Sequence, residues 1–125
     1  MLLIGCTQYV LKETIWAIRM SKNKIGILED FLPGTMRSMM IRGQEYMISN
    51  IEGSIYAIDG LCPHAKGKIA EGRLMGTIVI CPKHGAEFDV RTGKNLKKPR
   101  IPFAKAADIR SYKVTIEGKD VFLEL

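Results

Sequence analysis

Two short segments restrict the fold of this 125-residue chain most strongly, Cys62-Pro63-His64 and Cys81-Pro82-Lys83-His84. Together they contain both histidines of the chain and two of its three cysteines. Each segment places a thiol and an imidazole in a turn after a strand-like run, Ser54–Asp59 or Thr77–Ile80. The proline in each turn fixes φ, which lowers the entropy lost when the turn is ordered. A fold that brings the two turns together would present two sulfurs and two nitrogens to one point.

From residue 25 onward, short runs of β-forming residues alternate with turns. Glycine marks these turns because it adopts the positive φ that tight hairpins need. Three hairpins are predicted, Met36–Arg42 with Gln44–Asn50 around Gly43, Ile48–Ile51 with Ser54–Asp59 around Glu52-Gly53, and Tyr112–Ile116 with Val121–Leu125 around Glu117-Gly118-Lys119. Two more strands are expected at Thr77–Ile80 and Glu87–Val90, and an extended loop at Lys97–Pro102. The pattern favours an all-β fold, a small antiparallel β-sandwich or barrel.

The composition, with 46% hydrophobic residues, suits one domain with one modest core. We expect that domain at residues 21–125, preceded by an N-terminal extension of unknown role at residues 1–20. Within this extension Val10, Leu11, Ile15 and Ile18 have the spacing of a short amphipathic helix. No apolar run approaches the ~18 residues of a membrane-spanning helix. Three cysteines are too few for a disulfide framework, so a reducing, cytoplasmic setting is expected.

The two ligand segments and the sixteen residues between them resemble the paired motif of Rieske ferredoxins, which feed electrons to oxygenases. The flanking runs Ile58–Leu61, Ala70–Gly72 and Phe88–Gly93 are also similar to this family. The resemblance implies a Rieske-like β fold with a two-loop cluster-binding subdomain and one 2Fe–2S cluster. It further implies that Cys62 and Cys81 hold one iron and that His64 and His84 hold the other.

Three positions depart from the patterns of the wider family. Lys83 stands where the oxygenase-linked ferredoxins often have tryptophan, and Lys68 stands where proline is common. Ala86 occupies the place of a serine that donates a hydrogen bond near the cluster in the high-potential respiratory type. With fewer hydrogen bonds to the cluster, we expect a reduction potential near the low end of the Rieske range, roughly −150 mV.

Two other interpretations of these residues stand beside the cluster. Cysteine and histidine can simply pack in a β-sheet core, although here every histidine of the chain lies in a mixed pair. Alternatively, Cys62, His64, Cys81 and His84 could hold a tetrahedral structural zinc ion. Zinc fingers usually keep their cysteines in one pair and their histidines in another, whereas each half here contains both.

The resemblance implies an electron carrier between a reductase and an acceptor such as a terminal oxygenase, and not an enzyme. An oxygenase would need a further iron site with two histidines, and no G-x-G-x-x-G nucleotide fingerprint is present. Redox partners are expected to dock at the cluster tip. The formal charge is +6, and Lys94, Lys97, Lys98 and Arg100 form either a solvated face or a docking surface for acidic partners. Nucleic acid is not expected, because no aromatic residues alternate with these charges.

Overall fold

Three antiparallel sheets make up the computed structural model, which describes residues 21–63, 67–100 and 107–125. One sheet has the order β1-β11-β10, formed by Lys22–Ile27, Asp120–Glu124 and Val114–Glu117. The middle sheet has the order β2-β3-β4-β9, formed by Met36–Ile41, Gln44–Ile51, Ser54–Asp59 and Ser111–Tyr112. The third has the order β5-β6-β7-β8, formed by Arg73–Met75, Ile78–Ile80, Glu87–Asp89 and Asn95–Lys97. Two single-turn 3₁₀ helices, η1 (Leu28–Asp30) and η2 (Ile69–Glu71), complete the described part. The predicted all-β antiparallel class is confirmed.

Two-residue turns set the register of the middle sheet. Arg42-Gly43 joins β2 to β3, and Glu52-Gly53 joins β3 to β4. All four residues have left-handed backbone angles, with φ values of 53°, 79°, 52° and 95°. Such turns match the right-handed twist of the strands that they connect. The two hairpins predicted from these glycines are therefore confirmed.

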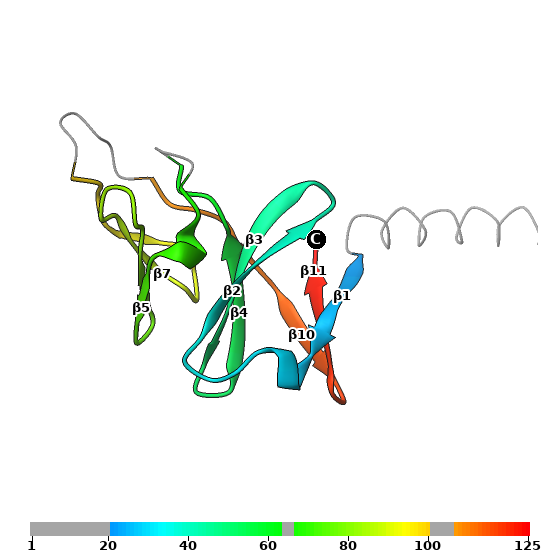
Figure 1. Cartoon of the computed structure of the whole chain (residues 1–125). Helices are drawn as coiled ribbons and strands as arrows, with labels where there is room; N and C mark the ends of the chain where they lie inside the picture. Colours follow the sequence, from blue (N-terminus) through cyan, green and yellow to red (C-terminus); the bar gives the residue numbers. More distant parts are fainter. Residues whose placement is uncertain (1–20, 64–66, 101–106) are drawn as a thin grey trace, which may run out of the picture.

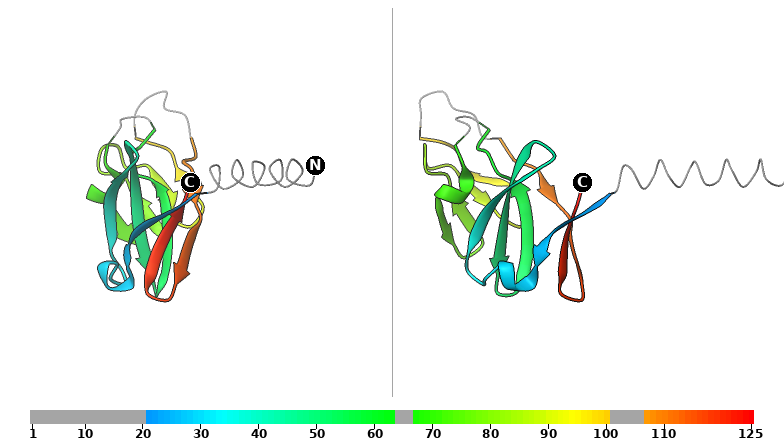
Figure 2. Two further views of the ribbon diagram at one scale, coloured as in Figure 1. Left: turned by 90° about the vertical axis from the view of Figure 1, so that its right-hand side faces the viewer. Right: turned by 45° about the vertical axis from the view of Figure 1, so that its right-hand side comes forward.

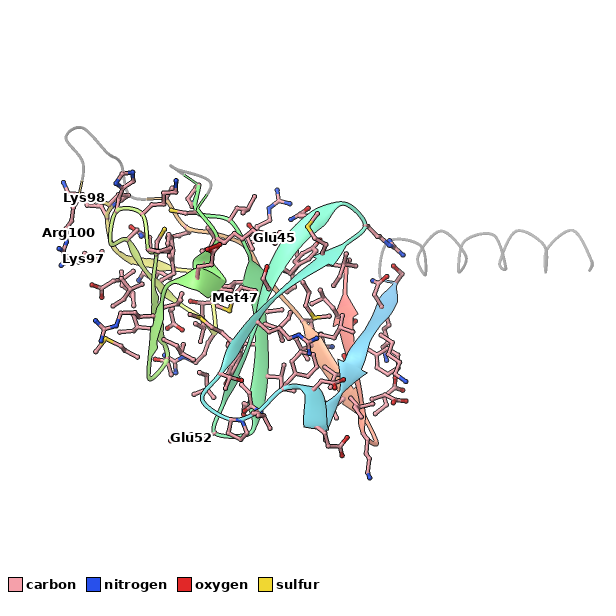
Figure 3. All side chains as sticks on the ribbon, in the orientation of Figure 1. Glu45, Met47, Glu52, Lys97, Lys98 and Arg100 are labelled. Atoms are coloured by element: carbon pink, nitrogen blue, oxygen red, sulfur yellow. The ribbon has the colours of Figure 1, made fainter. Side chains whose placement is uncertain are left out.

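The middle sheet lies between the other two sheets, and its strands β3 and β4 are buried on both faces (Figures 1 and 2). Along β3, Tyr46 and Ile48 pack toward β1 and β11, in a core that also includes Val121 and Leu123. Met47 points the other way, into a second core against the third sheet (Figure 3). Because side chains alternate along a strand, a strand buried on both faces has to be apolar at successive positions.

The third sheet belongs to a long excursion between β4 and β9. These two strands pair with each other, Ala57 with Tyr112 and Ile58 with Ser111. The amide of Asp59 donates to the carbonyl of Arg110 at 3.0 Å, directly where the chain leaves the middle sheet and returns to it. The segment from residue 60 to residue 109 therefore forms a separate subdomain on one face of the middle sheet. Both ligand segments lie in it.

The structure differs from the predicted strands at three places. Strands β1, β5 and β8 were not predicted, and β8 includes Lys97, the first residue of the expected Lys97–Pro102 loop. Strands of three residues, such as β5 and β8, show too few positions for a period of two to be recognised. The predicted N-terminal helical pattern lies outside the described residues. In the described part of the chain, no helix is long and apolar enough to cross a membrane.

Candidate metal centre

The first ligand loop connects β4 to η2. The amide of Cys62 donates to the carbonyl of Gly67 at 2.9 Å, and a bridge pairs Leu61 with Lys68. These contacts close a short loop that carries Pro63 and then residues 64–66. His64, the predicted ligand of this loop, lies outside the described residues.

The second ligand loop is the turn of the β6–β7 hairpin. The amide of Cys81 donates to the carbonyl of Ala86 at 2.8 Å, and the amide of Gly85 donates back to the carbonyl of Cys81 at 3.1 Å. Gly85 has a φ of +72°, a conformation that side-chain-bearing residues rarely adopt. The turn therefore holds Cys81 at its base and presents Lys83 and His84 at its outer end.

The two predicted cysteine ligands meet. Cys62 and Cys81 are unpaired in disulfides and each is 2% exposed. Both belong to one buried core cluster, and Cys62 is close enough to influence the pKa of the Cys81 thiol. Burial raises the pKa of the Cys81 thiol, while hydrogen bonds from the backbone N–H groups of Lys83 and His84 act in the opposite direction. Two thiols that share a buried position, with N–H donors aimed at sulfur, fit a cationic metal group that favours the thiolate form.

Close backbone contacts join the two loops. A Cβ on Gly67 would lie 2.6 Å from Cγ of Lys83, so the first loop packs directly on the second. A Cβ on Gly72 would lie 1.9 Å from the carbonyl oxygen of Ile80, the residue before Cys81. Gly67 allows the first loop to approach the second. Gly72, which follows η2, allows the start of β5 to approach the end of β6 directly before Cys81.

The first loop begins next to the carboxylate of Asp59 at the end of β4, which anchors the chain there. The sequence analysis did not identify Asp59 as functional. Asp59 accepts the hydroxyl proton of Tyr112 at 2.6 Å and the side-chain amide of Gln44 at 3.2 Å. Its second oxygen accepts the amide of Arg110 at 3.0 Å. Burial, followed by the hydrogen bond to Asp59, raises the pKa of Tyr112 to about 12. Asp59 lies three residues before Cys62, in one of the flanking runs that carry the family resemblance.

His84 is partly buried and lines a hollow of about 510 Å³ on the outer side of the second loop. Arg73, Lys83 and Arg100 also line this hollow. Arg100 is fixed near His84, because its amide donates to the His84 carbonyl at 2.8 Å. The structure thus places cations from β5, from the second loop and from the segment after β8 beside one predicted ligand.

The predicted basic group Lys94, Lys97, Lys98 and Arg100 does not act as one unit. Lys97 lies 3.9 Å from a carboxylate oxygen of Glu87, which neutralises it in part. Lys97, Lys98 and Arg100 lie together at the outer end of the subdomain (Figure 3). Of the four, Arg100 lines the hollow beside His84. Arg73, which was not part of the predicted basic group, also lines this hollow.

The described residues contain no group of three or more His, Cys, Asp and Glu side chains close enough to hold one metal ion. Cys62 and Cys81 converge, and His84 is not part of a three-residue set with them. A single tetrahedral ion needs its ligands around one point, whereas a binuclear cluster distributes them over two irons.

The sequence matches the family model described as "Rieske [2Fe-2S] domain" over residues 21–113. The ferredoxin component of the naphthalene 1,2-dioxygenase system of Pseudomonas putida is 37% identical over 98 residues, which cover 78% of this chain and 89% of that protein. The ferredoxin component of biphenyl 2,3-dioxygenase of Rhodococcus jostii is 32% identical over 106 residues, covering 85% of this chain and 94% of that protein.

Solved structures give the same result. The ferredoxin of carbazole 1,9a-dioxygenase from Nocardioides aromaticivorans IC177 superposes with a TM-score of 0.73 at 28% identity, covering 82% of this chain and 95% of that one. A chain in the complex of reduced oxygenase and oxidized ferredoxin of carbazole 1,9a-dioxygenase superposes with a TM-score of 0.74 at 25% identity, covering 82% of this chain and 92% of that one.

Proposed function

Because this chain belongs to the Rieske [2Fe-2S] family, as a ferredoxin with one Rieske-type cluster that carries single electrons, we propose that its donor is a reductase and its acceptor a terminal oxygenase. Similarity to ferredoxin components over most of their length supports this assignment. The structural observation that carries it is the pair of buried, free thiols contributed by two loops of the matched region. A structural zinc ion finds no support among the relatives.

For the site we propose four ligands, Cys62 and Cys81 on one iron and His64 and His84 on the other. The meeting of the two thiols supports the cysteine half of this set. The position of His84 at the outer end of the second loop supports a histidine-bound iron nearer the surface than the sulfur-bound one. When bound, the cluster supplies a site that accepts and releases one electron at a time.

The protein's own residues position and protect this site. Cys62 and Cys81 belong to the hydrophobic core with Ile69, Val79 and Phe88, which keeps water from their sulfurs. The backbone N–H groups of Lys83 and His84 donate to the Cys81 sulfur, an interaction that stabilises negative charge there. Solvation and hydrogen bonding around sulfur are two of the means by which a protein sets a cluster potential.

We further propose residues 21–125 as the working domain, with residues 1–20 as an extension. The family match over residues 21–113 and the pairing of β1 with the C-terminal β11 support this division. A cytoplasmic location is proposed as well, on the ground that two buried cysteines remain free thiols.

Cofactor analysis of purified protein tests the site. We expect two irons and two acid-labile sulfides per chain, and a rhombic resonance on reduction whose average g value lies below that of all-cysteine clusters. Cys62→Ser and Cys81→Ser should each lose the cluster, because serine removes the thiolate that anchors iron. Cys6→Ser is the matched control and should retain it. Full iron content in Cys81→Ser, or stoichiometric zinc without sulfide in wild type, would contradict the proposal.

Electron flow tests the partners. Under anaerobic conditions, NADH and a flavin-dependent ferredoxin reductase should bleach the cluster absorbance by one electron per chain. Addition of oxidised oxygenase component from a naphthalene 1,2-dioxygenase system should restore it. A cluster that bleaches normally but is not reoxidised by Rieske oxygenase components would overturn the oxygenase as acceptor.

A further inference from the structure

The basic hollow, which we define by Arg73, Lys83 and Arg100 around His84, opens on the second ligand loop. It is lined by that loop, Cys81 included, by the residues from Glu71 to Arg73 and by Arg100. Cys62 and the described residues of the first loop do not line it. The hollow therefore borders the proposed cluster site on the side of the second loop, next to its histidine.

The three cations of this hollow are exposed and have no ionic partner in the part of the chain that the structure describes. No described carboxylate lies within 4.0 Å of Arg73, Lys83 or Arg100. Seven other basic side chains each pair with an acid, and Glu71 is the one acidic residue that lines the hollow. The segments 64–66 and 101–106 contain no Asp or Glu. An uncompensated group of cations attracts anions and steers their approach.

Arg100 is held in place and does not merely extend into solvent. Its amide donates to the His84 carbonyl at 2.8 Å. A Cβ on Gly85 would meet its Nε at 3.3 Å, so the Arg100 side chain lies over the glycine next to His84. A guanidinium whose backbone is anchored in this way can bind a carboxylate through two parallel hydrogen bonds.

We propose that the basic hollow receives side-chain carboxylates from an acidic segment of the redox partner. This inference rests on the proposed function, since it gives that function a docking position on one side of His84. Two arginines and a lysine suit two or more carboxylates, and arginine binds them bidentately. Among the described residues, no Phe, Tyr or Trp lines the hollow, which argues against a platform for stacked nucleobases.

Such contacts give fast, salt-sensitive association. Exposed charge pairs contribute little to affinity but raise association rates, and salt screens them over about 10 Å at 0.1 M. A carrier has to leave its partner after each transfer, so steering without tight binding fits its task. The arrangement also places the partner's acidic segment against the same loop that holds His84.

The test measures oxidation of the reduced holoprotein by small inorganic oxidants. For the anionic oxidant hexacyanoferrate(III), Arg100→Glu and Arg73→Glu should each slow oxidation about threefold or more at low ionic strength, with little effect at 0.5 M salt. For the cationic oxidant hexaammineruthenium(III), both variants should be faster than wild type. Lys119→Glu is the matched charge control, because Lys119 lies in the β10–β11 turn at the opposite end of the molecule (Figure 1).

Hexaglutamate peptide distinguishes a protein partner from a small polyanion. It should slow the hexacyanoferrate reaction of wild type and leave that of Arg100→Glu unchanged, and Arg100→Gln should lie between the two. Equal effects of Arg100→Glu and Lys119→Glu on the oxidation rates would overturn the inference. It would also be overturned if tripolyphosphate slowed the hexacyanoferrate reaction of wild type and hexaglutamate did not. The visible and electron paramagnetic resonance spectra of each protein report the cluster separately. If the cluster spectra are normal but the oxidation rates do not depend on the charges of the basic hollow, only the docking inference is refuted. If wild-type protein has no cluster, the proposed function is refuted.

Discussion

Replacing Gly72 by alanine should displace the second ligand loop from the start of β5. The added Cβ would lie 1.9 Å from the carbonyl oxygen of Ile80 and 3.1 Å from Cδ of Pro82. A carbon and a carbonyl oxygen ordinarily meet at roughly 3.3 Å, so the backbones have to move apart by about 1.4 Å. Both contacts flank Cys81 directly in the sequence. The displacement therefore falls on the strand end that positions this sulfur.

The size of the displacement decides the outcome. Metal–ligand distances tolerate deviations of about 0.2 Å, and the positions of catalytic or binding side chains tolerate about 0.5 Å. A movement of about 1.4 Å exceeds both, so we expect Gly72→Ala to bind much less iron than wild type. Overpacking of this kind also lowers the free energy of unfolding, by about 1–3 kcal/mol.

Gly76→Ala is the matched control at the other end of β5. No atom lies within 4 Å of a Cβ at Gly76, but its φ is +61°. Alanine there should lower the free energy of unfolding by about 1–2 kcal/mol through backbone strain alone. We expect this variant to keep full iron content, measured by metal and sulfide analysis. If Gly72→Ala had the iron content and reduction potential of wild type, the reasoning would be refuted. The second ligand loop would then not need the close contact between Gly72 and Ile80.

Two further substitutions probe the supports of the site. Tyr112→Phe should lower the free energy of unfolding by about 1–2 kcal/mol in denaturant titrations, because Asp59 loses the hydroxyl that donates to it at 2.6 Å. Since the folded pKa of Tyr112 is raised from 10.0 to about 12, its contribution is fully present below pH 10. The difference from the variant should shrink as the pH rises toward 12, and a constant difference would contradict this. Ala86→Ser should raise the reduction potential, by roughly 40 mV if the new hydroxyl stabilises the reduced form by about 1 kcal/mol. Ala57→Ser, an equally buried control in the other core, should leave the potential measured by protein voltammetry unchanged.

The sequence predicted those features that depend on neighbouring residues. The hairpins at Gly43 and Gly53 follow from local turn chemistry, and both turns have the expected left-handed angles. Cys62 and Cys81 lie in one buried core cluster, which is consistent with the paired motif. The assignment of all four ligands stays a prediction, with His64 outside the described residues.

Features that depend on distant residues could not be predicted in this way. Arg73 and Arg100 line one hollow although 26 residues separate them in the sequence. Lys97 looked equivalent to Arg100, yet the pairing of β7 with β8 places it opposite Glu87. Which cations remain unpaired is decided by strand register, and three-residue strands leave too weak a pattern for that register to be inferred.

The junction between β4 and β9 should allow the subdomain of residues 60–109 to be replaced as one unit. Residues 60–109 leave and re-enter the scaffold at Asp59 and Arg110, whose backbones are hydrogen-bonded at 3.0 Å. Closing a loop of twice the length costs only about 0.6 kcal/mol more, so the size of an insert at this junction is scarcely restricted. Its one firm requirement is an apolar surface to cover Met47 and Ile58 on the face of the middle sheet that the subdomain buries. A protein engineer could therefore transplant other two-loop metal sites onto this β scaffold by matching one pair of ends and one apolar footprint.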